Sequence, residues 1–437
     1  MLLYANEHPR GSVLLVIPPR GGKTPTAGMA VRVVGDAGAS VLWVVNRIEL
    51  LDQAVQHLVA CGIPIEEIGV IAADRPVTPK AWCHVASENT LDRRNKPKAE
   101  FVVWDEAQHD AAPRRRRIRQ LYPDAFHLGI TGTPERLGGV GLDRDYDHMI
   151  VAVQPSELIH DEYLAVPEIF APDDEMIPSM RAVRSVGGDY TPAELDQLMN
   201  RDVLVENLVR EWVRLAENRQ TMIFPVTVEH SRAIVGAFVR AGIDASHLDG
   251  DTKMTERQEM LAGLRAGRKR LVSSVGVVSE GIDIREVKCV VLARPTKSLG
   301  LYLQQGARCM TPWPEGPRAR ILDAAGNTYR HGLPYQDREW ALEGRRKQRG
   351  GSPQAQAKRC ACGAVASVFA KVCGSCSKPF PRPPLPEIAP SELRRVEVTP
   401  EHIAADRARL EAFAQAKNFD PAWVTKVIAA KYGILAT

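Results

Sequence analysis

Short apolar runs alternate with helical patterns along the first third of the chain. The runs are four to six residues long and cover 14–17, 40–45, 84–87, 101–104 and 125–130. Continuous apolar runs of this length are typical of strands that are buried on both faces. Because segments with apolar residues at helical spacing separate them, the pattern predicts a parallel sheet covered by helices.

The same alternation begins again after Gly187-Gly188. A helical pattern starting at Asp202 leads into strand-like runs at 222–224, 245–248, 270–275 and 289–293. A chain of 437 residues with 44% hydrophobic residues is long enough to bury two cores. We therefore predict the α/β fold class, with two tandem parallel-sheet domains at 1–165 and 166–342.

Composition and charge limit the partners and the location that we expect for the protein. The formal net charge of +4 permits a polyanionic partner without requiring one. No apolar run is long enough to span a bilayer, and the first residues lack the order of a signal peptide. We therefore expect no membrane association and a cytoplasmic location.

The first apolar run ends in a turn that is typical of phosphate-binding loops. The turn contains Gly21 and Gly22 and closes on Lys23-Thr24, where a helix is expected to begin. Backbone N–H groups at a helix N-terminus favour an anion, Lys23 would reach the outer phosphates, and the Thr24 hydroxyl would hold Mg²⁺. The pattern has glycine where Ile17 and Arg20 stand here, so an ordinary turn between strand and helix remains an alternative.

Two adjacent carboxylates follow the fourth run. Asp105 and Glu106 come directly after 101–104, at the carboxyl end of a predicted central strand, where open α/β sheets bind ligands. With a nucleotide on the phosphate loop, Asp105 would hold Mg²⁺ and Glu106 would orient and deprotonate the attacking water. The alternative is that the pair only caps the next helix. Downstream, the run Arg114–Arg117 is most simply a solvated helix face, with a position beside a nucleic-acid phosphate as the alternative.

In order and spacing these stretches resemble the motifs of superfamily two DEAD/DEAH-like helicases. The Gly21–Thr24 stretch resembles their first motif, Asp105–Gln108 their Walker B box, and Thr131–Pro134 their coupling motif. The resemblance implies two RecA-like domains with an ATP site between them. It is strongest for a phage or prophage type of this superfamily, over roughly 13–334.

The second half carries the family's later motifs. The stretch 277–283 resembles the fifth motif, which implies a tight turn at Gly281 and contact between Asp283 and the nucleotide ribose. The stretch 301–312 resembles the sixth motif. On this resemblance Gln304 and Arg308 are catalytic residues that face the terminal phosphate from the second domain.

Departures from the sixth motif leave two functions open. The usual glycine is Ala307, and the usual second arginine is Thr311. An arginine finger is worth about three to five powers of ten in rate, so Arg308 alone would support slower hydrolysis, with Arg318 or Arg320 as substitutes. The resemblance implies an ATP-hydrolysing helicase or translocase. The alternative is a nucleic-acid-binding protein whose degenerate ATPase core acts as a nucleotide-dependent switch.

Four cysteines cluster near the C-terminus. Cys360 and Cys362 form one pair, and Cys373 and Cys376 form another. Two such pairs can present four thiolates tetrahedrally to a structural Zn²⁺ ion. The first pair has one intervening residue instead of two, so inert thiols remain the alternative. We predict a basic linker at 343–358, a zinc ribbon at 359–380 and a helical tail at 391–437.

The resemblance also sets expectations for cofactors and partners. It implies ATP and Mg²⁺ in the cleft, with Zn²⁺ as a separate structural ion. The expected partner is nucleic acid, DNA in preference to RNA, and basic residues before the ribbon favour contact there. We expect a monomer that works with replication or recombination proteins, in the host cytoplasm if a phage encodes it.

Overall fold

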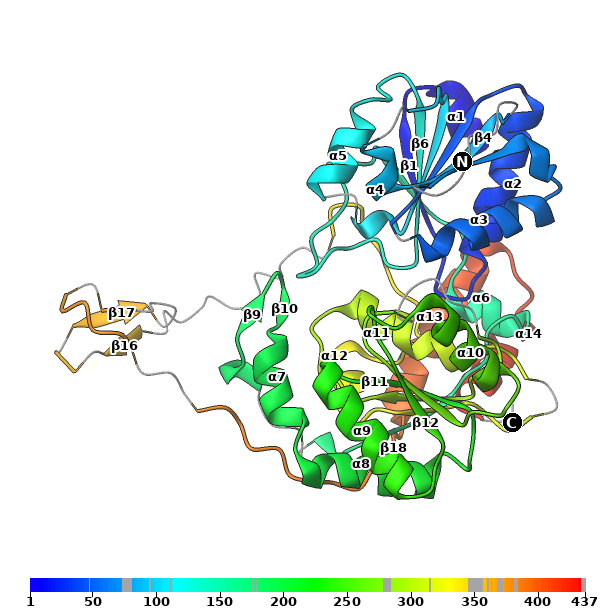
Figure 1. The fold of residues 1–437 in the computed structure, drawn as a ribbon. Helices are drawn as coiled ribbons and strands as arrows, with labels where there is room; N and C mark the ends of the chain where they lie inside the picture. Colours follow the sequence, from blue (N-terminus) through cyan, green and yellow to red (C-terminus); the bar gives the residue numbers. More distant parts are fainter. Residues whose placement is uncertain are drawn as a thin grey trace.

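The computed structural model describes most of the chain. The described residues are 1–46, 48–72, 81–93, 96–109, 112–174, 177, 180–277, 284–313, 316–344, 357–359, 361–362, 364–367, 372–373, 375–380 and 384–433. Two seven-stranded sheets form the centres of two α/β domains (Figure 1). The predicted tandem parallel-sheet architecture is therefore confirmed.

The first sheet has the strand order β3-β4-β2-β5-β6-β1-β7, and all its neighbours are parallel. Its strands are β1 (Ser12–Val16), β2 (Val41–Val45), β3 (Ile68–Ile71), β4 (Cys83–Ser87), β5 (Phe101–Asp105), β6 (Phe126–Thr131) and β7 (His148–Val151). The helices are α1 (Leu2–Glu7), α2 (Lys23–Asp36), α3 (Glu49–Ala60), α4 (Glu88–Leu91) and α5 (Pro113–Arg119). The core residues of α2 and α3 pack on one face and those of α4 and α5 on the other.

The second sheet has the order β12-β13-β11-β14-β15-β8-β18 and is parallel except for its edge strand β18. Its strands are β8 (Glu168–Ala171), β11 (Thr221–Phe224), β12 (Ala245–Leu248), β13 (Leu271–Ser274), β14 (Cys289–Leu292), β15 (Arg320–Leu322) and β18 (Arg394–Arg395). Its helices are α7 (Pro192–Met199), α8 (Asp202–Leu215), α9 (Val228–Arg240), α10 (Met254–Arg265), α11 (Leu299–Gly306) and α12 (Asn327–His331). A hairpin of β9 (Ser185–Val186) and β10 (Asp189–Tyr190) precedes α7.

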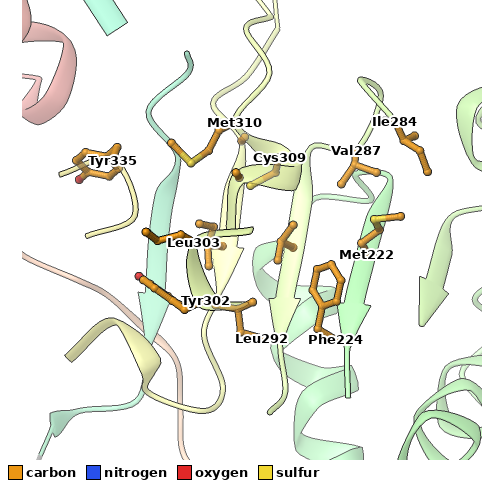
Figure 2. Close-up of a cluster of buried hydrophobic side chains, with 14 of the residues drawn as sticks. Met222, Phe224, Ile284, Val287, Leu292, Tyr302, Leu303, Cys309, Met310 and Tyr335 are labelled. Atoms are coloured by element: carbon orange, nitrogen blue, oxygen red, sulfur yellow. The ribbon is translucent and has the colours of Figure 1, made fainter. Parts of the chain in front are cut away.

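Helix α11 is fixed to the second sheet by its apolar face. Tyr302 and Leu303 lie in one buried cluster with Phe224 of β11 and Leu292 of β14 (Figure 2). The Tyr302 hydroxyl also donates to the Gly332 carbonyl at 2.9 Å. Because α11 cannot shift without opening this core, the loop that follows it has a defined position.

The C-terminal region returns to both domains. Leu342 packs beside Leu14 and Tyr146 of the first domain, and the Leu142 N–H donates to the Leu342 carbonyl at 2.7 Å. Strand β18 then joins the second sheet, so part of the predicted helical tail is an edge strand.

The last two helices are α13 (Pro400–Lys417) and α14 (Ala422–Tyr432), which pack on each other. Helix α14 also packs on α6 (Pro155–His160), in the connection between the domains. No helix among the described residues is long and apolar enough to cross a membrane.

A small two-stranded sheet stands apart from both domains, at the left of Figure 1. It consists of β16 (Ala357–Arg359) and β17 (Val365–Ser367), which pair antiparallel. It lies in the predicted ribbon region, and Cys360 falls outside the described residues.

Candidate nucleotide site and cysteine cluster

The predicted phosphate loop joins β1 to α2. Gly22 caps the helix with φ of 86°, a left-handed conformation that favours glycine. At Gly21 an added Cβ would lie 2.8 Å from Ile17 Cγ2 and 2.9 Å from the Pro18 carbonyl oxygen, so no larger residue fits without movement. Both glycines therefore shape the loop, and the N–H groups of the first helical turn lack helical partners and can bind an anion.

Lys23 reaches the second acid of the pair. Its Nζ lies 2.6 Å from Glu106 Oε1, and both side chains are mostly buried. Glu106 has φ of 51°, which is uncommon for a residue other than glycine. The Gln108 Nε2 donates to Glu106 Oε2 at 2.7 Å. Lys23, predicted to bind the phosphates, and Glu106, predicted to orient the attacking water, are thus in direct contact.

Asp105 lies at the end of β5 and is buried. Burial and the adjacent Glu106 carboxylate raise its pKa to about 6, against the opposing effect of Lys23 and Arg115. A buried carboxyl of raised pKa gains most from a nearby cation, so this side chain suits the Mg²⁺ role predicted for it. Thr24, the other predicted Mg²⁺ residue, lines one cavity together with Asp105.

The coupling motif is linked to Glu106 through Gln108. The Thr131 Oγ1 donates to Gln108 Oε1 at 2.6 Å, and the same hydroxyl accepts from the Thr133 N–H at 3.1 Å. A Cβ added to Gly300, on α11 of the second domain, would lie 2.9 Å from Thr133 Oγ1. The chain of contacts therefore runs from the acidic pair to the facing domain.

A cavity of about 420 Å³ separates the two domains. From the first domain it is lined by Lys23, Thr24, Asp105 and Glu106, and from the second by Gln304, Ala307, Arg308 and Thr311. The Gln304 Nε2 donates to Glu106 Oε2 at 3.3 Å across the cleft. The structure thus brings together the predicted catalytic residues from both domains. Gly281 and Asp283 lie outside the described residues.

The suggested substitutes for the missing arginine do not reach this cavity. Arg318 is exposed. Arg320 begins β15, where it forms ion pairs with Glu168 at 3.1 Å and Glu217 at 2.6 Å. Arg320 is therefore held by two carboxylates, and neither arginine belongs to the lining of the cavity, so the replacement of Thr311 by either one stays a prediction.

Sequence reasoning missed three arginines. Arg285 lines the cavity, and Arg20 reaches the second domain. Arg115 was assigned to a solvated face, yet it is 1% exposed. It donates to the carbonyls of Asp105 at 2.8 Å and Glu106 at 3.2 Å. Its burial was hidden inside a four-arginine run, whose other members are substantially exposed.

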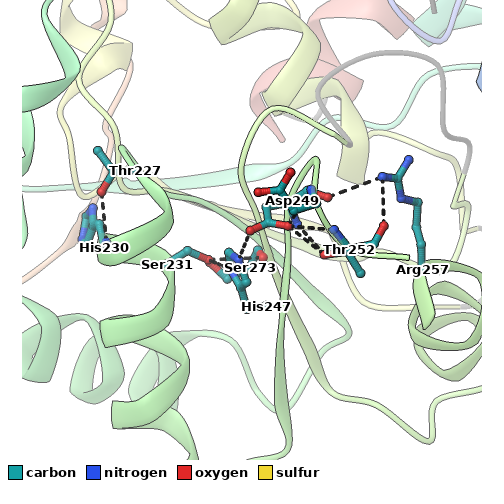
Figure 3. Close-up of polar contacts among 9 residues, drawn as sticks. Thr227, His230, Ser231, His247, Asp249, Thr252, Arg257 and Ser273 are labelled. Carbon is teal, nitrogen blue, oxygen red and sulfur yellow. Dashed lines mark hydrogen bonds and ion pairs between the residues drawn. The ribbon is translucent and has the colours of Figure 1, made fainter. Parts of the chain in front are cut away.

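A hydrogen-bonded serine, histidine and aspartate lie elsewhere in the second domain (Figure 3). His247 Nε2 is 2.9 Å from Asp249 Oδ2, and His247 Nδ1 is 2.7 Å from Ser231 Oγ. Ser231 is fully buried, so no substrate can reach its hydroxyl. The His247 hydrogen bond, aided by Thr252, lowers the pKa of Asp249 to about 2 despite partial burial. This network fixes the 248–252 turn and is not a hydrolase site.

Three of the four clustered cysteines converge. The sulfurs of Cys362, Cys373 and Cys376 all lie within 4.8 Å of one another, and those of Cys362 and Cys373 are 3.6 Å apart. Tetrahedral zinc with Zn–S bonds of about 2.3 Å places its sulfurs about 3.8 Å apart. The described thiols therefore fit three ligands of one zinc ion.

The fold defines a protein with two RecA-like domains, and the cavity between them brings together the residues predicted for a nucleotide site. Residues 3–136 match the family described as type III restriction enzyme, res subunit, and residues 186–311 match the helicase conserved C-terminal domain. These matches identify helicase domains in both halves of the chain, and together with the phage relatives they support a phage-type helicase of superfamily two.

Relatives agree with this assignment. A 51.5 kDa protein of a Lactococcus phage is 29% identical over 405 residues, which cover 92% of this chain and 84% of the phage protein. A provisionally named ATP-dependent helicase of Saccharomyces cerevisiae, IRC3, is 25% identical over 55% of this chain. The chain spans only 37% of the length of IRC3.

Solved structures share the fold. The DNA-bound type ISP restriction-modification enzyme LlaBIII superposes with a TM-score of 0.53 at 17% identity, over 74% of this chain and 26% of that enzyme. A single-residue variant of the S. cerevisiae protein Dbp5, bound to RNA and ADP BeF3, superposes with a TM-score of 0.51 at 16% identity, over 73% and 81% of the two chains.

Proposed function

We propose that this protein is an ATP-driven helicase or translocase that hydrolyses ATP in the cleft between its two domains. The observation that carries the proposal is the contact of Glu106 with Lys23 at 2.6 Å and with Gln304 at 3.3 Å. One carboxylate is thus reached by the phosphate loop of one domain and the sixth motif of the other. An active site that needs both domains can couple a change in the nucleotide to a movement between them.

Each residue of the cleft has a separate role in the proposed hydrolysis of ATP. Lys23 exchanges Glu106 for the outer phosphates of ATP. Thr24 and Asp105 would hold Mg²⁺, which would offset phosphate charge. Glu106, released from Lys23, accepts the proton of the attacking water while Gln304 orients that water. Arg308 stabilises the charge that develops on the transferred phosphate.

We propose that nucleic acid binds across the top of both domains, with DNA preferred to RNA. Membership of the helicase superfamily supports the nucleic acid partner, and the net charge of +4 is compatible with it. We propose that the protein acts as a monomer in the cytoplasm, alongside replication or recombination proteins.

The cysteine cluster is proposed to be a structural zinc site. Cys362, Cys373 and Cys376 supply three thiolates, and Cys360 is the proposed fourth ligand. A closed shell of four thiolates has no position for water, so the ion would stabilise the ribbon without taking part in hydrolysis.

The competing function is a nucleotide-dependent switch that binds nucleic acid without efficient turnover. It is favoured by Thr311, which stands where the second arginine of the motif belongs. The two functions separate in a steady-state ATPase assay without nucleic acid, with single-stranded DNA and with single-stranded RNA. Translocase function predicts Mg²⁺-dependent turnover that nucleic acid stimulates. ATP binding with no turnover under all three conditions would contradict it and favour the switch.

A further inference from the structure

Arg20 has an unfavourable backbone conformation within the phosphate loop. Its φ is 71°, in the left-handed region that residues other than glycine seldom occupy. Such a conformation costs on the order of 1 kcal/mol and persists where surrounding contacts hold it. Contacts of the Arg20 side chain must therefore offset this free-energy cost.

The Arg20 guanidinium crosses the cleft and binds three backbone carbonyls of the second domain. Its Nε donates to Ala307 at 3.2 Å, and its Nη2 donates to Arg308 at 3.0 Å and Ile284 at 3.3 Å. Ala307 and Arg308 lie in the 3₁₀ turn Ala307–Cys309, directly after α11. Carbonyls at the end of a helix lack helical partners and carry its negative dipole end, so a guanidinium is well suited to bind them.

The bound turn is the part of the second domain that completes the nucleotide site. Gln304 stands in the last turn of α11, and Arg308 lies within the 3₁₀ turn that Arg20 caps. Tyr302 and Leu303 fix the apolar side of α11 in a core that also contains Ala307 and Cys309 of the turn. Arg20 adds direct hydrogen bonds between the phosphate loop and the carbonyls of this turn.

We propose that Arg20 is a positioning residue that ties the phosphate loop to the turn carrying Arg308, so that the single remaining arginine of the sixth motif approaches the terminal phosphate in register. The role rests on the proposed function for its effect on ATP turnover. The structural part of the proposal does not depend on turnover. It is the set of hydrogen bonds from Arg20 to the second domain, which we call the latch.

The variant Arg20→Gly tests the contact between the domains without changing the conformation of the phosphate loop. Arg20→Gly removes the guanidinium and adopts φ of 71° without strain, so the phosphate loop should keep its shape. Arg20→Lys keeps a positive charge but lacks the planar fork that reaches several carbonyls together. Arg10→Ala is the matched control, since Arg10 pairs with Asp124 on the surface of the same domain and both side chains are 74% exposed.

Amide hydrogen exchange of the nucleotide-free, full-length protein tests the latch directly. In Arg20→Gly and Arg20→Lys, the peptide covering 299–310 should exchange several-fold faster than in the wild type and in Arg10→Ala. Equal exchange in all four proteins would overturn the latch, whatever their ATPase activity. If the wild type showed no ATPase activity but Arg20→Gly still changed exchange, the proposed function would fail and the latch would stand.

Kinetics test the positioning role. Arg20→Gly should lower kcat about ten- to a hundredfold, because a displaced catalytic group loses rate on this scale, while KM for ATP stays within about threefold, as expected when only a transition-state contact is lost. Combined with Arg308→Ala, Arg20→Gly should add almost no further loss, since Arg20 acts through Arg308. Additive losses, or a rise in KM with kcat unchanged, would show that Arg20 serves nucleotide binding instead.

Discussion

Glu106 is the residue on which the contacts of the cleft converge. Lys23, Gln108 and Gln304 bind its carboxylate at 2.6, 2.7 and 3.3 Å. Arg115 donates to the backbone carbonyl of Glu106 at 3.2 Å. A carboxylate held from several sides in a left-handed backbone conformation is positioned with little freedom, which suits the orientation of a water molecule.

Substitutions of Lys23 and Glu106 should separate binding from hydrolysis. Lys23→Ala removes the charge that faces the outer phosphates, so ATP binding should be lost. Glu106→Gln keeps the size of the side chain but cannot accept a proton, so binding should persist while turnover falls by about a hundredfold or more. Fluorescent-nucleotide titration and a phosphate-release assay measure the two effects. Wild-type turnover in both variants would contradict the proposed site.

Asp105 should make stability depend on pH. Its pKa rises from 3.8 when unfolded to about 6 in the fold, so the folded state holds its proton more tightly. The ionised form therefore destabilises the nucleotide-free fold above pH 6, and this penalty fades as the pH falls toward 4. Asp105→Asn should unfold at a higher temperature than the wild type at about pH 8, by the equivalent of about 3 kcal/mol, with a smaller difference at about pH 5. A constant difference between these two pH values would contradict the shift.

Single residues show where sequence reasoning reached its limit. Lys23, Asp105 and Glu106 were predictable because each follows a buried strand, and parallel strands bring their carboxyl ends to one edge. Arg115 was not, because its burial depends on Glu88, which lies 2.9 Å away and comes from another helix. The role of Arg20 was equally hidden, since its partners are 264 to 288 residues away in the sequence.

Among the elements, the strands were the most predictable and the C-terminal segments the least. Continuous apolar runs mark buried strands, and the predicted strands are present in both sheets. Strand β18 contains Arg394 and Arg395 and has no apolar run, because an edge strand is held by backbone hydrogen bonds to β8. The helices of the predicted tail begin after Thr399, which caps α13 with its Oγ1 accepting from the His402 N–H at 3.3 Å.

The ribbon should depend on its metal. Replacing Cys373 and Cys376 by Ser should release about one Zn²⁺ per chain, because two of four ligands are lost. The small sheet should unfold and nucleic acid binding should weaken, while basal ATP hydrolysis persists, since the cleft residues lie elsewhere. Elemental analysis and a DNA-binding assay check this. A metal-free wild-type protein with the same DNA affinity as the double variant would show that these cysteines are only thiols.

The last helix pair should depend on a buried ion pair. Lys431 Nζ lies 3.2 Å from Asp406 Oδ2, and the two side chains are 0% and 5% exposed. Lys431→Ala leaves a buried carboxylate without this partner and should destabilise the packing of α13 on α14 by about 3 kcal/mol. Limited proteolysis should then cleave this region much faster. Lys426→Ala, on an exposed site of the same helix, is the control, and equal cleavage of the two variants would contradict the argument.

In the whole molecule, the C-terminal segments hold the connection between the two domains. Asp337 accepts from the Ser156 N–H at 2.8 Å at the start of α6, and Arg409 of α13 donates to the Asp337 carbonyl at 2.7 Å. Trp423 of α14 lies beside His160 at the other end of α6. The domains are thus joined through α6 at one side and through Arg20 and Gln304 across the cleft. In this arrangement, closure of the cleft would move both domains.

The most direct test of this arrangement is ATP turnover by Arg308→Ala. Arg308 comes from the second domain, so its effect on chemistry at the phosphate loop of the first domain reports whether the site is completed across the cleft. We predict that the affinity for ATP changes little while single-turnover hydrolysis falls by about three powers of ten or more. Unchanged hydrolysis in Arg308→Ala would contradict the account, because the first domain would then hydrolyse ATP without its partner.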